Sequence, residues 1–482
     1  MNNRIKQAWK SEKTWRAGSL VYTTPALVAV FFWLLFGDFS WSMRDRSVGP
    51  MSQWFLSNLG VSNIVFALLI STFPALIGLF LGPIISVKSD RHRGRRGRRI
   101  PFLLVSTPLA ALGMIGIGLS PVIAGQLHAL LQPGSGIGAA LHGLMAQGPA
   151  GQRAFEFLSS ETAVSVACFA VFWSIFEIAT IVAQSVFGGL LNDVVPRELL
   201  GRFFGLFRAV SLVDGMVFNF WIMGWVPTHF TVILIIVGLT YGTAFLWMCF
   251  KVREGTYPPP EPLDNSQSPL VQAATGVRVY FRESFSNPYY LSIFLLIAAG
   301  NLVFAPVNLF AIPFAKSVGV DMAVYGKFLT LTYFISLCLA YFIGWLADVY
   351  HPLRVVMAAL AGYLLLSLYG AYHATTPGAF LVVWVLHGVL GGCYATGAAS
   401  LGQKLFPRSK FAQFASAAGI VGSLASSSLA PLMGLVIDHT GNTYRHTFAG
   451  GALLAILALS ASVFVYRGFV KLGGPRNYTA PE

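Results

Sequence analysis

Long apolar runs, separated by short polar segments, dominate this chain. A helix that crosses the hydrocarbon core of a bilayer needs about 20 mainly apolar residues. Twelve runs approach or exceed that length: 22–42, 63–87, 101–119, 162–190, 204–226, 229–250, 291–315, 323–347, 354–373, 379–403, 411–437 and 446–467. They predict an all-α membrane protein with twelve transmembrane helices. The first helix reaches about residue 56 if the polar residues from Asp38 onward belong to it.

The composition supports the membrane interpretation. Charged residues make up 10% of the chain, against roughly 25% in an ordinary soluble domain. Hydrophobic residues make up 55%, and the mean hydropathy is +0.68. A chain with so few charges cannot cover a water-exposed surface. The basic N-terminus and the first apolar run predict a retained helix, because no small-residue cleavage site follows closely.

The net charge of +14 comes from basic residues that lie between the apolar runs. With both termini in the cytoplasm, the cytoplasmic segments hold 25 of the 32 Lys and Arg residues and the opposite side holds five. Cytoplasmic loops of membrane proteins carry such an excess. The pattern predicts a multi-pass protein of a bacterial inner membrane, with basic loops facing anionic headgroups, and it argues against nucleic-acid binding.

Two long segments divide the chain. We interpret 120–160 as an external loop, with room for a short interfacial helix, and 251–290 as a central cytoplasmic linker. The linker carries apolar residues at helical spacing, which predicts a helix on the membrane surface: Val271, Ala274, Val277, Phe281 and Phe285. The predicted domains are an N-terminal six-helix bundle at 1–250 and a C-terminal one at 291–482.

The two halves of the chain repeat short landmarks. Pro196 and Arg197 follow the fourth run, and Pro407 and Arg408 follow the tenth. The segment SVKSD ends at Asp90 after the second run, and GWLAD ends at Asp348 after the eighth. Equivalent loops in both halves predict a pseudo-symmetric repeat of six helices. Chance similarity between loop segments is the alternative.

The segment SDRHRGRRGRRIPF, from Ser89 to Phe102, lies between the second and third runs. It resembles the signature loop of the major facilitator superfamily, and more closely the variant found in glycoside cation symporters and sucrose transporters. Arg96 departs from that variant, which usually has an aromatic residue there, and Ser86 departs from the general signature, which has Gly. The resemblance implies a monomeric secondary transporter of two six-helix bundles that works by alternating access.

The resemblance also implies a cytoplasmic gate. In the family, the matching acidic and basic residues hold the helical bundles together on the cytoplasmic face. Carried over to this sequence, the gate would consist of Asp90, Arg91, Arg98 and Arg99, with Asp193 from the next cytoplasmic loop. The alternative is that the basic loop only sets the orientation in the membrane.

Charged residues inside the apolar runs are candidates for coupling. A charge in a spanning helix is costly and normally faces a cavity or a partner. The first half holds Asp38, Glu177, Asp214 and Arg208 in such runs. We hypothesise that Glu177, with Asp38 or Asp214, couples solute movement to a proton, with Arg208 as a pairing or snorkelling residue. Sodium is the alternative coupling ion, since carboxylates also bind hard cations.

Further polar residues, in the runs or in the longer version of the first helix, are candidates for solute binding. Asp45 and Gln184 in the first half, and Asn301, Asn308, Tyr333 and His387 in the second, could line a cavity. Amide and aromatic side chains suit a hydroxylated solute such as a sugar. The alternative is that they hydrogen-bond between helices.

These features predict a cation-coupled importer of a small polar solute, a sugar or glycoside. An exporter or an uncoupled facilitator is the alternative, and a polytopic membrane enzyme is a remote one. The four cysteines lie inside apolar runs without metal-ligand spacing, so we expect no metal site and no cofactor besides the coupling ion. We expect no enzyme, because the chain has no sizeable extramembrane domain and no acidic or metal-binding cluster.

Overall fold

The computed structural model describes residues 14–145, 148–259, 278, 280–407 and 410–481. The chain forms two compact units. The first comprises the described residues of Met1–Gly60, Phe80–Phe218 and Trp225–Pro260, and the second those of Val61–Leu79, Asn219–Gly224 and Glu261–Glu482. The second unit therefore takes residues 61–79 from the N-terminal half. The domain boundaries predicted from the sequence stay a prediction.

The first unit opens with a short hairpin and continues as helices. Strands β1 (Thr14–Ala17) and β2 (Leu20–Thr23) pair antiparallel, with Thr14 opposite Thr23. The helical elements of this unit are α2 (Thr24–Asn58), most of α4 (Phe73–Arg91), α5 (Ile100–Leu131), α6 (Gly136–Met145), α7 (Pro149–Leu158), α8 (Glu161–Val194), η2 (Arg197–Leu199), α9 (Leu200–Val217) and α10 (Val226–Lys251). Helix α2 packs against both α9 and α10, and α5 packs against α8 and α10.

Helix α2 is a single helix of 35 residues. The structure therefore favours the longer of the two predicted first helices. Arg44 and Arg46 lie inside it rather than in an external loop. The basic residues predicted on the side opposite the cytoplasm fall from five to three, which strengthens the charge bias.

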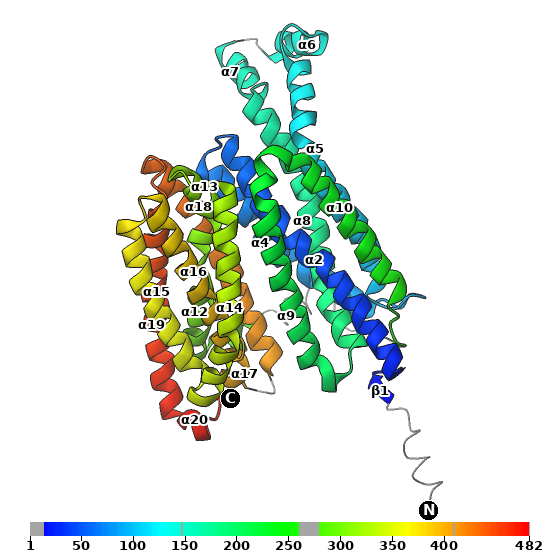
Figure 1. Ribbon diagram of the computed structural model, residues 1–482, viewed down its shortest axis with the longest axis vertical. Helices are drawn as coiled ribbons and strands as arrows, with labels where there is room; N and C mark the ends of the chain where they lie inside the picture. Colours follow the sequence, from blue (N-terminus) through cyan, green and yellow to red (C-terminus); the bar gives the residue numbers. More distant parts are fainter. Residues whose placement is uncertain (1–13, 146–147, 260–277, 279, 408–409, 482) are drawn as a thin grey trace, which may run out of the picture. The chain divides into compact units, whose positions relative to one another are not determined.

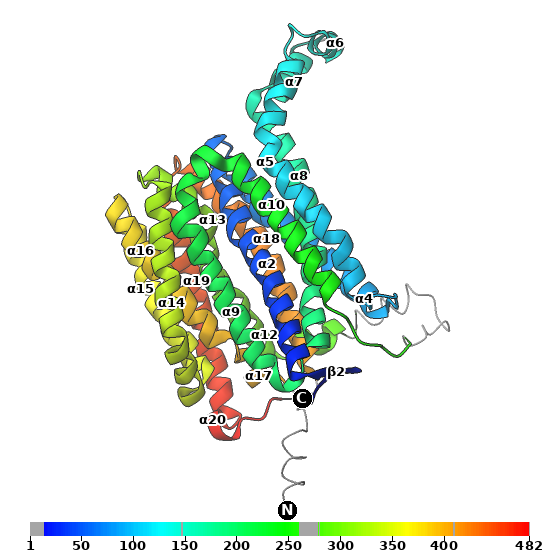
Figure 2. The same cartoon turned by 45° about the vertical axis from the view of Figure 1, so that its right-hand side comes forward.

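The predicted loop at 120–160 is mostly helical. Helix α5 continues to Leu131, and α6 and α7 fill most of the stretch before α8 begins at Glu161. Its 32 residues make α5 about 48 Å long at 1.5 Å per residue, whereas the bilayer core is about 30 Å thick. Figures 1 and 2 both show the ends of α5 and α8 projecting with α6 and α7 beyond α2 and α10.

The fifth and sixth predicted runs form one continuous helical stretch, Arg202–Lys251, of 50 residues. A straight helix of that length would measure about 75 Å, more than twice the bilayer core. The stretch instead changes geometry at a π-helical segment, η3 (Phe218–Ile222), and at a tight turn, η4 (Met223–Trp225), and His229 is non-helical. Figure 1 shows the chain turning back there.

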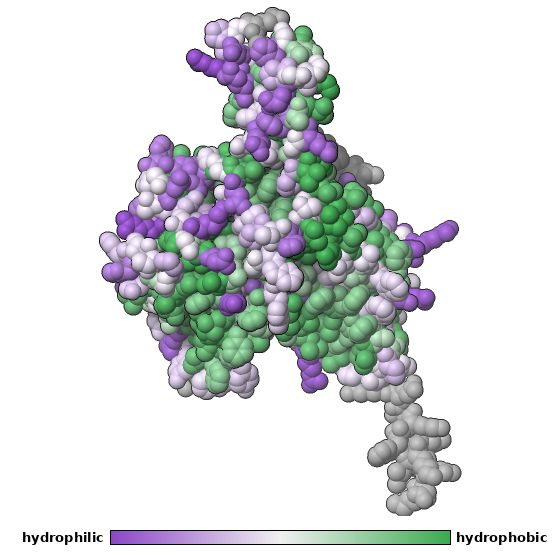
Figure 3. Space-filling view, turned by 45° about the horizontal axis from the view of Figure 1, so that its top comes forward, coloured by the Kyte–Doolittle hydropathy of each residue, from purple (hydrophilic) through white to green (hydrophobic). Residues whose placement is uncertain are grey.

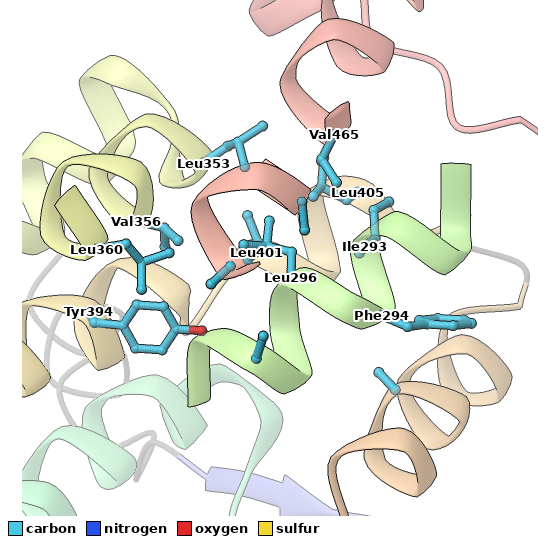
Figure 4. Close-up of a cluster of buried hydrophobic side chains, with 14 of the residues drawn as sticks. Ile293, Phe294, Leu296, Leu353, Val356, Leu360, Tyr394, Leu401, Leu405 and Val465 are labelled. Atoms are coloured by element: carbon cyan, nitrogen blue, oxygen red, sulfur yellow. The ribbon is translucent and has the colours of Figure 1, made fainter. Parts of the chain in front are cut away.

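The second unit holds the remaining elements. From the N-terminal half they are α3 (Asn63–Ala67), η1 (Leu68–Thr72), the first turns of α4, and most of η3 and of η4. From the C-terminal half they are α12 (Pro288–Leu302), α13 (Ala305–Ser317), α14 (Met322–Tyr350), α15 (Pro352–His373), α16 (Pro377–Ala398), α17 (Leu401–Leu405), α18 (Phe411–His439), α19 (His446–Lys471) and α20 (Gly474–Asn477). Figure 4 shows part of its core, where Phe294, Leu360 and Val465 come from α12, α15 and α19.

The surface of the helices is strongly apolar. Large hydrophobic side chains such as Phe80, Leu365 and Leu453 are 68%, 70% and 70% exposed, and Figure 3 shows hydrophobic residues covering broad stretches of the visible face. Eleven helices in the described part of the chain are long and apolar enough to cross a membrane. Because one of them covers two predicted runs, all twelve runs fall on such helices. The chain is a multi-pass membrane protein, and the predicted fold class is confirmed.

The linker helix predicted within 251–290 lies partly outside the described residues. Val271, Ala274 and Val277 are outside them, whereas residues 280–285 are helical. The same holds for the repeat landmark at Pro407 and Arg408: Pro407 is described and Arg408 is not.

Candidate functional site

Two acidic side chains are completely buried in the first unit. Asp38 on α2 and Asp214 on α9 are both 0% exposed. Neither carboxylate accepts a hydrogen bond from a basic side chain or backbone N–H group among the described residues, and the Ser42 hydroxyl lies near Asp38. The two groups lie close enough to repel each other when both are ionised. The packing of α9 against α2 therefore brings together two of the predicted coupling residues.

A buried arginine, Arg44, lies on α2, the helix that carries Asp38. Arg44 is 1% exposed, and its guanidinium lies 4.0 Å from the ring centre of Trp41 and 5.3 Å from that of Tyr241. It donates to Thr180 Oγ1 on α8 at 3.3 Å and to Asp45 Oδ1 at 3.0 Å. Aromatic faces and oxygen acceptors offset the cost of removing the charge from water.

Glu177 on α8 belongs to this arginine group rather than to the aspartate pair. Its side chain is half-buried, and its carboxylate interacts electrostatically with Arg44 and Asp45. Asp214 lies near Arg46, which donates to Ser211 Oγ at 3.1 Å. The first unit thus contains two acidic centres, and Asp45 lies near enough to influence both Asp38 and Glu177.

The other predicted residues of the first unit are more exposed. Asp45 is 67% exposed although it pairs with Arg44. Gln184 on α8 and Arg208 on α9 are also exposed. Their predicted roles in solute binding and coupling stay predictions.

The signature loop folds into a compact ion-pair network within the first unit. Arg98 donates to Asp193 through Nε and Nη2, at 2.9 and 2.6 Å. Arg99 donates to Asp90, and its Nε lies 3.6 Å from Asp193. The hydrogen bond to Asp193 raises the pKa of Arg98. Four of the five predicted gate residues are therefore in contact, and the fifth, Arg91, ends α4 and is exposed.

Glu254, just after α10, completes the loop and was not predicted. Its carboxylate accepts the backbone N–H groups of Arg98, Arg99 and Ile100 at 2.9, 2.8 and 2.7 Å. These groups begin α5, where helical N–H groups lack intrahelical partners and negative charge is stabilising. Gly97 has φ +100°, and a Cβ there would meet Glu254, so only glycine fits.

Tyr257 ties the start of the linker to the same loop. Its hydroxyl donates to Glu254 Oε2 at 3.0 Å, and the Arg98 guanidinium lies 4.2 Å from its ring centre. Burial, followed by the neighbouring carboxylates of Glu254 and Asp193, raises the pKa of Tyr257. The only sequence signal for this contact was an acid four residues after the sixth run.

The second unit contains a cavity of about 690 Å³. Its lining combines apolar residues, both small and large, with five polar side chains: Asn301, Tyr394, Gln403, Ser423 and Ser426. None of the described lining residues is charged. Gly300 makes room for the Tyr394 hydroxyl, which would lie 2.3 Å from an added Cβ. Of the predicted solute-binding residues, this cavity includes Asn301.

Asn308 and His387 form a different group. His387 is 1% exposed, with Nε2 3.0 Å from Asn308 Oδ1 and Nδ1 2.8 Å from the Tyr363 hydroxyl. Because the amide oxygen only accepts, Nε2 carries the proton and Nδ1 accepts from Tyr363. Asn308 is exposed, and Tyr333 on α14 lines neither the cavity nor this network. Asn301 and Asn308 therefore do not line one common cavity in this structure, and their predicted roles in solute binding stay predictions.

Among the described residues, no group of three or more His, Cys, Asp or Glu side chains is arranged to hold a metal ion.

Comparison with known proteins identifies the class of membrane protein to which this fold corresponds. Residues 303–477, within the second unit, match the model of the Major Facilitator Superfamily. The chain has the fold of major facilitator transporters, and the match and the likeness together indicate a transporter rather than an enzyme. No curated protein matches the chain.

Three solved structures illustrate the likeness. A bacterial homologue of the human lysosomal transporter Spinster, inward-facing and occupied, is 13% identical with a TM-score of 0.61, over 95% of this chain and 99% of that one. A D-xylose-proton symporter is 13% identical with a TM-score of 0.59, over 92% and 96%. A peptide transporter in complex with sulfate is 14% identical with a TM-score of 0.61, over 92% and 95%. At these identities the likeness concerns the fold.

Proposed function

We propose that this protein is a secondary active transporter that carries a small, uncharged, hydroxylated solute, a sugar or glycoside, together with protons. The observation that carries the coupling proposal is the pair Asp38 and Asp214, two fully buried carboxylates on adjacent helices that accept no hydrogen bond from a described basic side chain. Burying an unpaired negative charge is costly. We therefore infer that the pair holds at least one proton when it is sealed from water.

The two acidic centres would have different roles. The pair Asp38 and Asp214 would bind the transported proton, because neither carboxylate accepts a hydrogen bond from a described arginine, although the charge of Arg46 lies near Asp214. Glu177 would respond to the solute through Arg44, whose charge is balanced by Asp45 and Glu177. This refines the hypothesis in which Glu177 was the main coupling residue.

The solute class rests on the cavity of the second unit. A volume of about 690 Å³ is within the range of small-molecule sites. Its amide and hydroxyl groups can hydrogen-bond a hydroxylated molecule, and the lack of charge among its described lining residues disfavours an ionic solute. The likeness of the signature loop to sucrose and glycoside transporters supports the same class. A D-xylose-proton symporter among the structurally similar proteins is consistent with it.

Transport by purified protein in liposomes tests the proposal. We expect labelled sugars or glycosides to accumulate only with an inward proton gradient. Asp38→Asn and Asp214→Asn should abolish accumulation while exchange of solute across the membrane without a gradient continues. Glu156→Gln, an exposed acid on α7, is the control and should transport normally.

Other outcomes would overturn specific parts of the proposal. Accumulation that survives in the Asp38→Asn/Asp214→Asn double variant would exclude this pair from coupling. Accumulation driven by a sodium gradient alone would replace the proton. Equilibration without accumulation would favour an uncoupled facilitator, and outward movement only would favour an exporter. If no sugar is transported, the solute class is wrong, and organic acids and drugs should be tested next.

A further inference from the structure

A second, strongly basic cavity lies in the first unit, where the signature loop meets the end of α10. Its volume is about 380 Å³. Three of the residues that line it are arginines, Arg95 and Arg96 from the loop and Arg253 from the segment after α10. All three are exposed. The remaining lining residues are Ile100, Cys249, Phe250, Val252 and Glu254.

The single acid among the lining residues, Glu254, already accepts hydrogen bonds from other groups. The Glu254 carboxylate accepts three backbone N–H groups at the start of α5 and the Tyr257 hydroxyl. It therefore points its oxygens at the helix end rather than at the guanidinium groups. Three like charges share one cavity without a free counter-charge among its described lining residues. An anion bound there would be attracted by all three.

The cavity also has an exposed apolar border. Trp247 and Phe250 are 56% and 59% exposed, and they lie three residues apart on one face of α10. The Arg96 guanidinium lies 4.9 Å from the ring centre of Phe250. Tryptophan is typical of the membrane–water interface, where apolar helix surface meets the headgroups. The site thus joins a cationic cavity to an exposed apolar helix surface.

We propose that Arg95, Arg96 and Arg253 bind the phosphate headgroup of an anionic phospholipid, whose acyl chains lie along Trp247 and Phe250. Guanidinium groups bind phosphate through paired hydrogen bonds. A soluble anion would use the arginines but would gain nothing from the aromatic border. A phospholipid uses both. The site is separate from the buried acids and from the cavity of the second unit, so it does not depend on the proposed transport function.

Lipid binding by the purified full-length protein tests this inference. Delipidated protein in a neutral detergent would be titrated with phosphatidylglycerol, phosphatidylcholine or inorganic phosphate, and bound lipid counted by native mass spectrometry. We expect phosphatidylglycerol to bind in preference to phosphatidylcholine. Arg95→Gln/Arg96→Gln/Arg253→Gln should bind it about tenfold or more weakly.

A charge-matched control separates a site from general attraction. Arg153→Gln/Arg202→Gln/Lys471→Gln removes three exposed basic residues elsewhere and should keep nearly the parental affinity. Equal loss in both triple variants would overturn the proposal, because only net charge would then matter. Competition by inorganic phosphate at the same concentration as the lipid would also overturn it in favour of a soluble anion.

A single variant tests the proposal even if the triple variant fails to fold. Arg253 is exposed and lies just beyond α10, so Arg253→Gln should elute as the parental monodisperse species. It should still bind phosphatidylglycerol several-fold more weakly than the parent, and Arg253→Lys should recover part of the loss because charge returns without the paired geometry. Unchanged lipid binding by the single variant would exclude Arg253 from the site.

Discussion

At the scale of single residues, this protein buries several charged side chains, and these differ in how many interaction partners they have. Arg44 has aromatic faces, a hydroxyl and a carboxylate around it, although its Nε has no described partner. Asp38 has the Ser42 hydroxyl near it, but neither Asp38 nor Asp214 accepts a hydrogen bond from a described basic side chain. A structural charge is normally paired. This contrast suggests that the charge of Arg44 helps to hold the helices together. In the proposed mechanism, the two aspartates bind the proton.

Glu254 provides a residue-scale prediction about stability. Glu254→Ala leaves three backbone N–H groups at the start of α5 without their acceptor. Losing such a cap costs about 1–2 kcal/mol, and we expect a lower midpoint of thermal unfolding in detergent. Glu254→Gln, which keeps an oxygen acceptor but not the charge, should lose less.

Glu156→Gln serves as the control for this experiment, because Glu156 is exposed on α7 and its one described hydrogen bond is to Gln152. It should unfold at the parental temperature. If Glu254→Ala unfolded at the parental temperature too, the carboxylate would not stabilise the start of α5.

At the scale of elements, one contact joins the start of α3 to the end of α18 inside the second unit. The Asp438 carboxylate accepts the backbone N–H groups of Asn63 and Ile64 at 2.8 and 3.0 Å, and the Asn63 side-chain amide at 2.7 Å. It caps α3 from a helix 375 residues away in the chain. A Cβ on Gly434 would lie 2.5 Å from the Asn63 carbonyl oxygen, so the two backbones touch only because this residue is glycine.

Asp438→Asn tests the strength of this contact. An amide presents one oxygen where the carboxylate presents two, so at least one N–H of α3 loses its acceptor, at a cost of about 1–3 kcal/mol. We expect faster amide hydrogen exchange in residues 63–72, measured by mass spectrometry of the protein in detergent. Asp348→Asn, an exposed acid near the end of α14, is the control. Equal exchange in the two variants would show that Asp438 does not hold this segment.

This contact bears on alternating access. Residues 61–79 belong to the N-terminal half by sequence but to the second unit by contact. If the two halves of the chain move against each other during transport, the hydrogen bonds of Asp438 have to break and re-form. Capping interactions of about this strength can be exchanged in such a cycle.

At the scale of the whole molecule, the distribution of basic residues predicts the orientation. With α2 extending to Asn58, 25 Lys and Arg residues lie on the side of the termini and three lie opposite. A bias of this size should place both termini in the cytoplasm and the tip formed by α6 and α7 outside.

Cysteine labelling in intact cells checks that orientation. Gly143→Cys, on exposed α6, should react with a membrane-impermeant maleimide in intact cells. Thr479→Cys, near the exposed C-terminal end, should react only after the membrane is permeabilised. The parental protein, whose four cysteines lie in apolar helices, gives the background. Labelling of Thr479→Cys but not Gly143→Cys in intact cells would reverse the orientation.

The sequence by itself determined the membrane class, the positions of twelve apolar runs and the fold. These follow from local properties: about 20 apolar residues span a bilayer wherever they occur, and backbone hydrogen bonds inside the bilayer require helices. The signature loop also predicted that Asp90, Arg98, Arg99 and Asp193 would be close together, through resemblance to a family. The local pattern was misleading at 120–160, where many Gly, Ala and Gln residues suggested a loop although most of the stretch is helical.

Only the tertiary structure decided which residues share a site. The pairing of Asp38 with Asp214, the capping of α5 by Glu254 and of α3 by Asp438, and the separation of Asn301 from Asn308 all join or divide residues on different helices. Such contacts depend on which helix faces pack together and how far each helix is rotated and shifted. In a membrane, where apolar surface covers nearly every helix face, hydrophobic pattern carries little information about that packing.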